Sequence, residues 1–369
     1  MKKNYTLLLL FSTLLGFGQI PTGYYTSATG TGFTLKTQLF NIIKGHTVKT
    51  YAELYTTYAT SDIDNFYEND GSVLDMYSEK PSGVDPYNFS IATTQRCGSY
   101  SVEGDCYNRE HIIPQSVFNS ASPMVSDAHF ITPTDGKVNG YRSNYPHGMV
   151  GTLDVPPSSI TNPTKNGSKL GNGLNSSYSA GYTGIVFEPI DEFKGDIARM
   201  YFYFATRYED LITTWGTTYP MFDGTANQVF TPTFKNILLQ WNQNDPVSPR
   251  EIARNNAIYA RQNNRNPYID NNSYVTSVWG PAPLSTETFN VFSNVSVFPN
   301  PTNDHKINIQ ADITLDEIDL ININGQLIQV IKKPVMSNNT FTLENLPQGF
   351  YFLKLTSDNQ TTTKKVVVN

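Results

Sequence analysis

The sequence predicts an α+β protein in two parts, a large mixed domain and a small all-β domain that follows it. Two segments, Lys194–Leu211 and Ser248–Gln262, carry apolar residues at helical spacing. Tyr87–Ile113 instead alternates β-favouring residues with turn residues, which predicts strands within the same domain. From about Val295 onward the apolar segments alternate and no good helix remains. This last part is therefore predicted to be a β-sandwich.

The first residues have the layout of a secretory signal peptide. Lys2 and Lys3 precede the apolar stretch Leu7–Leu15, and small residues follow at Gly16 and Gly18. We expect a signal peptide over residues 1–18 and a protein that passes through the periplasm to the outside or the cell surface. No later apolar run approaches the roughly 20 residues of a spanning helix, so we expect a soluble monomer without a membrane span.

Composition changes divide the rest of the chain. We expect a large domain over 19–280, a linker over 281–294, rich in Pro and Thr, and a β domain over 295–369. The strands expected in the β domain are INIQ, IDLINI, GQLIQVI, FTLENL, GFYFLKLTS and TTTKKVVVN.

The first half of the large domain is predicted to mix short helices and strands. Phe33–Ile43 predicts a helix with Thr34 as its cap, and Tyr51–Tyr58 predicts a second one. Residues 71–80 predict a strand that enters a turn, and Tyr87–Ile113 predicts a hairpin.

The second half begins with Asn162–Gly184, which is rich in Gly, Ser and Asn and predicts a surface loop. The run MYFYFATRY in the helix that follows has helical spacing, so its rings are expected in the core rather than on a base-stacking surface. In the last helix, Ser248 can cap, Pro249 fits the first turn and Glu251 completes a capping box.

Cys97 and Cys106 are the two cysteines, nine residues apart. In an oxidising compartment this pair predicts a disulfide, and the spacing is poor for zinc. On the chain-entropy model, closing so short a loop stabilises the folded state by roughly 2–3 kcal/mol. We expect its main effect on the geometry just ahead of Glu110 and His111.

The segment NREHIIPQS places the carboxylate of Glu110 beside the imidazole of His111. A single histidine is more often structural than catalytic, and His46, His147 and His305 are expected to be structural. His111 differs because SDAHFITPTDGKVNGYRSN follows it. That stretch supplies Asp127, His129, Asn139, Arg142 and Asn144.

A hard-metal site explains these residue types best. The chain has neither the paired helical histidines of a zinc peptidase nor a Gly-x-Ser-x-Gly elbow, although its composition does not exclude a Ser-His-Asp hydrolase. Magnesium prefers oxygen ligands and keeps several waters, so Glu110 and Asn139 are enough. His111 then stays unligated and can take a proton from water. Arg142, three residues after Asn139, would face the same phosphate.

Strand geometry constrains this site. Neighbours in a regular strand point to opposite faces, so Glu110 and His111 converge only where the strand bends or ends. Pro114 indicates such an end, since it has no N–H for a ladder.

Several ordered blocks resemble the endonuclease I family of secreted, non-specific bacterial nucleases, whose site is a ββα-metal motif. The blocks are NREHIIPQS, SDAHFITPTDGKVNGYRSN, FEPIDEFKGDIARMYFYFATRY and NRNPYID, with KGHTVKTY and LDMYSEKP upstream. The resemblance spans about residues 24–275.

This resemblance implies roles for single residues. His111 falls on the general base, Glu110 and Asn139 fall on the metal ligands, and Asp127 and His129 fall on supporting positions. The implied reaction is magnesium-assisted hydrolysis of DNA, and of RNA too, that leaves 5′-phosphates; Mn²⁺ or Ca²⁺ are the other candidate ions. For the arginine that contacts the phosphate, Arg142 is the first candidate and Arg109 the second.

The formal net charge of −6 argues mildly against a polyanionic partner, but a local basic groove can still hold phosphates. Four arginines supply one candidate surface if the last helix extends far enough. Their contacts would be to backbone phosphates and so indifferent to base sequence. They are Arg250, Arg254, Arg261 and Arg265.

The C-terminal part resembles the type A sorting domain of the type IX secretion pathway. The resemblance rests on VFPNPTND, INGQLI, LPQGFYFLKL and the end KKVVVN. It implies that this domain addresses the protein to the secretion machinery and carries no catalysis.

A second function class stays open. Abundant Tyr and Asn, the export signals and the acidic charge also suit a surface adhesin or carbohydrate-binding protein. In that case Glu110 and His111 form a buried pair and Asn139 is a turn residue.

Overall fold

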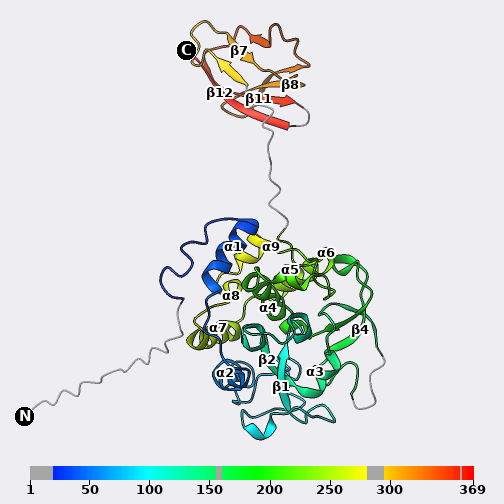
Figure 1. Cartoon of the computed structure of the whole chain (residues 1–369). Helices are drawn as coiled ribbons and strands as arrows, with labels where there is room; N and C mark the ends of the chain where they lie inside the picture. Colours follow the sequence, from blue (N-terminus) through cyan, green and yellow to red (C-terminus); the bar gives the residue numbers. More distant parts are fainter. Residues whose placement is uncertain (1–19, 155–159, 281–294, 358–359) are drawn as a thin grey trace, which may run out of the picture. The chain divides into compact units, whose positions relative to one another are not determined.

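The computed structural model describes residues 20–154, 160–280, 295–357 and 360–369 (Figure 1). The chain divides into two compact units, Met1–Ala282 and Pro283–Asn369. The predicted signal peptide, 1–18, and the predicted linker, 281–294, lie outside the described residues. Helices with small sheets in the first unit and antiparallel sheets in the second confirm the α+β prediction.

The first unit packs its helices around α4, Lys194–Arg207, whose 14 residues are all buried. Helices α1, α6 and α8 contact it. The other helices are α1 Gly32–Ile43, α2 Leu54–Ser61, α3 Gly136–Arg142, α5 Ile212–Trp215, α6 Pro232–Asn244, α7 Pro249–Gln262, α8 Pro267–Asp270 and α9 Ser273–Trp279. In the part of the chain that the structure describes, no helix has both the length and the apolar character to cross a membrane.

The predicted helices are present, with two corrections at their ends. Helix α1 begins at Gly32, so Thr34 lies inside it and is not the cap. Thr50 instead caps a short 3-10 helix, Tyr51–Glu53, that leads into α2. The capping box of Ser248 and Glu251 at α7 is confirmed, with Glu251 N–H donating to Ser248 Oγ at 3.2 Å.

Two strands and a helix form a ββα unit (Figure 1). Strand β1, Tyr107–His111, pairs antiparallel with β2, Ile131–Asp135, and α3 follows at once. Asp135 caps α3 by accepting the Val138 N–H at 2.8 Å. The predicted hairpin within Tyr87–Ile113 is wrong, because β1 pairs with a strand from farther along the chain.

Two further predictions of secondary structure are wrong. Residues 71–80 form no strand, and Val73 makes an isolated bridge with Ile63. The predicted surface loop at 162–184 contains β4, Lys169–Gly173, which pairs with β3, Val150–Leu153, and with β5, Ile185–Glu188. Pairing with the neighbouring strands therefore outweighs the loop-like composition of β4.

The second unit has two antiparallel sheets over one core, and its described residues contain no helix. One sheet has the order β10-β7-β6 and the other β12-β11-β8-β9. The strands are β6 Ser296–Phe298, β7 Ile307–Gln310, β8 Glu317–Asn322, β9 Leu327–Lys332, β10 Thr340–Leu343, β11 Gly349–Ser357 and β12 Gln360–Val368. All six strands predicted from the alternating pattern are found.

Asp127 organises the polar part of the first unit's core. Its Oδ2 accepts the hydroxyls of Tyr203 at 2.8 Å and Tyr208 at 2.9 Å, and its Oδ1 accepts the Gln262 amide at 2.9 Å. Burial would raise the pKa of Asp127, but His46, His129 and these donors outweigh it and lower the pKa to about 2. Asp127 thus joins α4, α7 and the segment before β2.

We expect Asp127→Asn to lower the free energy of unfolding by about 2–3 kcal/mol at neutral pH, since it removes a charged acceptor from buried donors. The folded pKa lies below the unfolded one, so this stabilisation is complete above about pH 4 and is lost as pH falls towards about 2. The difference in the free energy of unfolding between wild type and variant should therefore shrink as the pH falls from about 4 to about 2.

Urea unfolding followed by tryptophan fluorescence measures this difference, because Trp215, Trp241 and Trp279 all lie in the first unit. Asp210→Asn, at an exposed position, is the control. A difference in the free energy of unfolding that stays constant from pH 6 to 2 would contradict the role of Asp127.

Candidate functional site

A cavity of about 290 Å³ lies where β1 ends beside α3. It brings together Glu110 and His111 from β1 and Asn139 from α3, the three residues that were predicted to surround a metal ion. The lining residues are Tyr51, Cys97, Gly98, Asn108, Arg109, Glu110, His111, Pro114, Gln115, Asn139, Arg142, Ser143 and Asn144.

The carboxylate of Glu110 is only 2% exposed and is held by Tyr77, Arg142 and the His111 backbone. Its Oε1 accepts the Tyr77 hydroxyl at 2.9 Å and Arg142 Nη1 at 2.9 Å. Neither bond uses Oε2. Burial raises the pKa of Glu110, although Arg142 and Tyr77 oppose that shift.

Arg142 lines the cavity, and its guanidinium bonds to Glu110 and to backbone carbonyls. Its Nη1 also donates to the His111 carbonyl at 2.8 Å, its Nη2 to the Ile112 carbonyl at 2.7 Å, and its Nε to the Tyr145 carbonyl at 3.0 Å. The side chain is 1% exposed. Every guanidinium nitrogen is engaged by groups of the described chain, which argues against the predicted contact of Arg142 with the scissile phosphate.

Asn139 is oriented by its neighbour on β1. Its Nδ2 donates to Asn108 Oδ1 at 2.7 Å, which leaves the amide oxygen as a free acceptor group. The following residue, Gly140, lets Tyr100 pack closely on α3. A Cβ at Gly140 would lie 2.0 Å from the Tyr100 hydroxyl oxygen.

His111 has its ring held by a backbone carbonyl. Its Nε2 lies 3.2 Å from the Val125 carbonyl, which can only accept, so Nε2 carries the proton. The lone pair of the neutral ring is therefore on Nδ1. Burial lowers the pKa of His111 to about 4, so the ring is neutral at neutral pH.

Arg109 is better placed than Arg142 to meet an anion. Its guanidinium stacks on the Tyr51 ring at 3.5 Å and on the Tyr55 ring at 4.6 Å. Nη1 donates to the Tyr51 carbonyl at 3.0 Å, while the buried Nε has no hydrogen-bond partner within the described structure. Arg109 thus brings a cation with unused donors to the cavity wall.

A layer of buried residues behind Glu110 was not predicted from the sequence. Tyr77 Oη lies 3.0 Å from His147 Nε2, and His147 Nδ1 lies 2.9 Å from Tyr201 Oη. Since Tyr77 gives its own proton to Glu110, Nε2 of His147 is the donor. Burial lowers the pKa of His147, which stays neutral. The block LDMYSEKP, which contains Tyr77, was the signal that could have revealed this layer.

Asp127 and His129 lie in the core and do not line the cavity. His129 Nε2 contacts the Asn264 carbonyl at 3.0 Å, and its ring packs on Tyr203 at 4.6 Å. Burial lowers the pKa of His129 to about 4. Asp127 lies two residues after Val125, whose carbonyl holds His111.

The predicted arginine surface is wrong for three of its four members. Arg254 pairs with Asp62 at 2.7 Å and Arg265 with Asp270 at 2.6 Å, and Arg250 pairs with Asp196. These arginines are at most 3% exposed, because each meets a buried acid from another segment. Arg261 is 26% exposed and bonds to Thr57 at 2.8 Å.

The residues of the cavity fit a hard divalent ion. Glu110 Oε2 is not used by Tyr77 or Arg142, and the amide oxygen of Asn139 is free because its nitrogen is the donor. Two protein oxygens suffice for magnesium when waters complete its shell. The predicted disulfide, Cys97–Cys106, is present, and Cys97 forms part of the wall.

Family models match both units. The endonuclease I family model matches residues 31–273, and the secretion system C-terminal sorting domain matches residues 296–369. The sorting domain and the extracellular relatives place the protein outside the cell or on its surface.

Three relatives show the same likeness. The chain is 33% identical to the extracellular ribonuclease of Bacillus amyloliquefaciens over 264 residues, covering 69% of this chain and 78% of the relative. It is 33% identical to that of Bacillus subtilis (strain 168) over 265 residues, with the same coverages. Endonuclease-1 of Buchnera aphidicola subsp. Baizongia pistaciae (strain Bp) is 28% identical over 144 residues, 39% of this chain and 46% of that protein. The protein is a secreted nuclease that belongs to the endonuclease I family.

Proposed function

We propose that this nuclease is a metal-dependent endonuclease that hydrolyses phosphodiester bonds of DNA and RNA and leaves 5′-phosphate ends. One observation carries the proposal: Glu110, His111 and Asn139 line one cavity, and the Val125 carbonyl holds the His111 ring through Nε2. The names of the relatives, extracellular ribonuclease and Endonuclease-1, support RNA as a substrate and cleavage within the chain.

In this proposal His111 is the general base. Its Nδ1 takes the proton of a water molecule that attacks phosphorus in line with the departing 3′-oxygen. The Val125 carbonyl fixes the tautomer that makes Nδ1 basic. The low pKa keeps the ring uncharged before the proton moves.

Glu110 and Asn139 would hold magnesium, with manganese or calcium as the other candidates. When bound, the ion supplies a positive charge that stabilises the phosphorane-like transition state and the departing oxygen. Tyr77 and Arg142 hold Glu110 in place for this role, and Asn108 orients the Asn139 amide so that its oxygen stays free.

Arg109 is our candidate for the phosphate contact. A second cavity, of about 340 Å³, shares Ser143 with the first and is lined by Lys137 and three tyrosines, Tyr100, Tyr141 and Tyr145. Aromatic rings beside a cation can stack bases and hold phosphates without reading sequence. We place the path of the nucleic acid there instead of along α7.

His111→Ala is expected to lower the cleavage rate by about 100- to 10,000-fold, because it removes the general base. Plasmid DNA incubated with the purified protein and magnesium measures the rate, and end-labelling identifies the 5′-phosphates. Binding of the ion should survive, since His111 is not a ligand.

Chelation of the wild type is the matched control and should abolish cleavage. Cleavage that persists both with chelator and in His111→Ala would contradict the proposed centre. A wild-type protein that degrades no nucleic acid would instead favour an adhesin or carbohydrate-binding protein.

Arg109→Gln is expected to impair catalysis, whereas Arg142→Gln is expected to impair stability. Losing a phosphate contact at Arg109 should lower kcat/KM about 10- to 1,000-fold with little change in melting temperature. Arg142→Gln should destabilise the protein by about 3–5 kcal/mol, since it leaves Glu110 buried without its cation. Kinetics and thermal melting on the same preparations separate the two. Equal destabilisation by both changes would contradict the distinct roles of the two arginines.

Single-stranded DNA and RNA of one sequence should be cut at rates within about tenfold of each other. The proposed contacts are to phosphates and base faces, which both polymers offer, and none reads a 2′-hydroxyl. Initial rates on the two labelled oligonucleotides, with equal magnesium, test this. A preference above about a hundredfold would show a contact to the sugar that this proposal lacks.

A further inference from the structure

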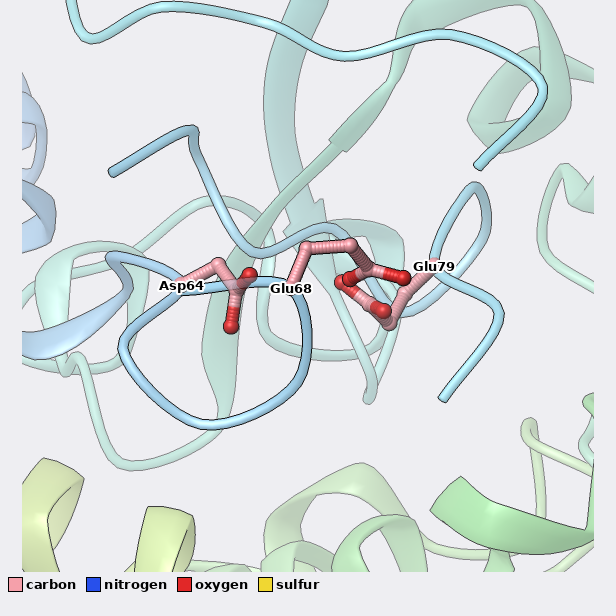
Figure 2. A group of neighbouring side chains, drawn as sticks. All are labelled: Asp64, Glu68 and Glu79. Carbon is pink, nitrogen blue, oxygen red and sulfur yellow. The ribbon is translucent and has the colours of Figure 1, made fainter. Parts of the chain in front are cut away.

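A second group of acidic side chains lies apart from the catalytic cavity. Asp64, Glu68 and Glu79 each offer a carboxylate oxygen, and these oxygens lie within 4.8 Å of one another. Figure 2 shows the carboxylates of Glu68 and Glu79 close together, with that of Asp64 beside them. None of the three lines the cavity that holds Glu110.

This group lacks the cation that several other buried acids have. Asp62, Asp196 and Glu251 each pair with a buried arginine. Across the described residues, no Lys, Arg or His forms an ion pair with Asp64, Glu68 or Glu79.

Glu79 is the side chain that points to a ligand. It is 1% exposed, and its Oε1 is buried without a hydrogen-bond partner among the described residues. A buried carboxylate oxygen without a donor is costly. Burial, and then Asp85 and Glu68, raise the pKa of Glu79 to about 9, so the apo group resists carrying its full charge.

The loop that carries Asp64 and Glu68 is held by hydrogen bonds from its own backbone to Asp64. Asp64 Oδ1 accepts the N–H groups of Phe66 and Tyr67, both at 3.0 Å, and its Oδ2 accepts that of Asn69 at 2.9 Å. These bonds fold the loop back on itself. A carboxylate oxygen has two lone-pair positions, so Oδ2 keeps one for a cation.

We propose that Asp64, Glu68 and Glu79 form a calcium-binding site separate from the catalytic centre. Ca²⁺ takes six to eight oxygen ligands in flexible geometry, whereas magnesium demands near-ideal octahedral geometry and keeps several waters. Three carboxylates supply up to six oxygens, which suits calcium better than the water-rich shell of magnesium. The protein works outside the cell, where sites of modest affinity can fill.

Calcium at this site stabilises the segment behind the catalytic centre. Glu79 lies two residues after Tyr77, whose hydroxyl donates to Glu110. Asp75, in the same segment, accepts the N–H groups of Tyr77 at 2.8 Å and Asp135 at 2.7 Å. Binding therefore holds a segment that reaches both β1 and the start of α3.

Thermal melting of the full chain, freed of metal and titrated with calcium chloride alone, tests the proposal. We expect a rise of several degrees, because calcium at a hundred times its Kd lowers the unfolding equilibrium constant about 100-fold. Magnesium should need higher concentrations for the same rise. Tryptophan fluorescence follows the first unit specifically, and no step depends on nuclease activity.

Three substitutions locate the effect. Glu68→Gln changes an exposed residue, so the protein should fold but lose the calcium-dependent rise. Asn139→Ala, in the catalytic cavity, and Glu192→Gln, an exposed acid elsewhere, should keep it. The proposal is overturned by no rise up to about 10 mM calcium, by an equal rise in Glu68→Gln, or by loss of the rise in Asn139→Ala.

Discussion

The buried contact between Arg142 and Glu110 holds the ββα unit together. Arg142 ends α3, and its guanidinium donates to the Glu110 carboxylate and to the carbonyls of His111 and Ile112, just where the ladder of β1 stops. These bonds fix the last residues of β1 against the helix. Two successive strand residues can therefore serve one cavity, although regular strand geometry would send them apart.

The tyrosines and histidines behind this contact keep it rigid. Tyr77 and His147 connect Glu110 to Tyr201 through a buried chain of polar contacts. Asp127 forms a second buried network with Tyr203, Tyr208 and Gln262. A buried polar network with its donors and acceptors paired is stiff. It therefore holds the few residues that are exposed in the cavity in defined positions.

Local sequence patterns predicted part of this architecture well. The capping box at Ser248, the strands of the second unit and the meeting of Glu110, His111 and Asn139 follow from local signals or motif resemblance. The pairing of β1 with β2 did not, because a strand's partner is set by distant residues. The arginines of α7 were misjudged for a similar reason. A charge pattern on one helix does not reveal that Asp62 and Asp196 lie in the core to pair with it.

The disulfide determines when the wall of the cavity is completed. Cys97 and Gly98 form part of the wall, and the Cys106 carbonyl accepts the Gly136 N–H at 2.8 Å where α3 begins. A thiol pair closes into a crosslink in oxidising surroundings and stays open in the reducing cytosol. The last covalent step in building this wall is thus tied to export, so the polypeptide completes its working surface only after it has been separated from the genome and transcripts of the cell that made it.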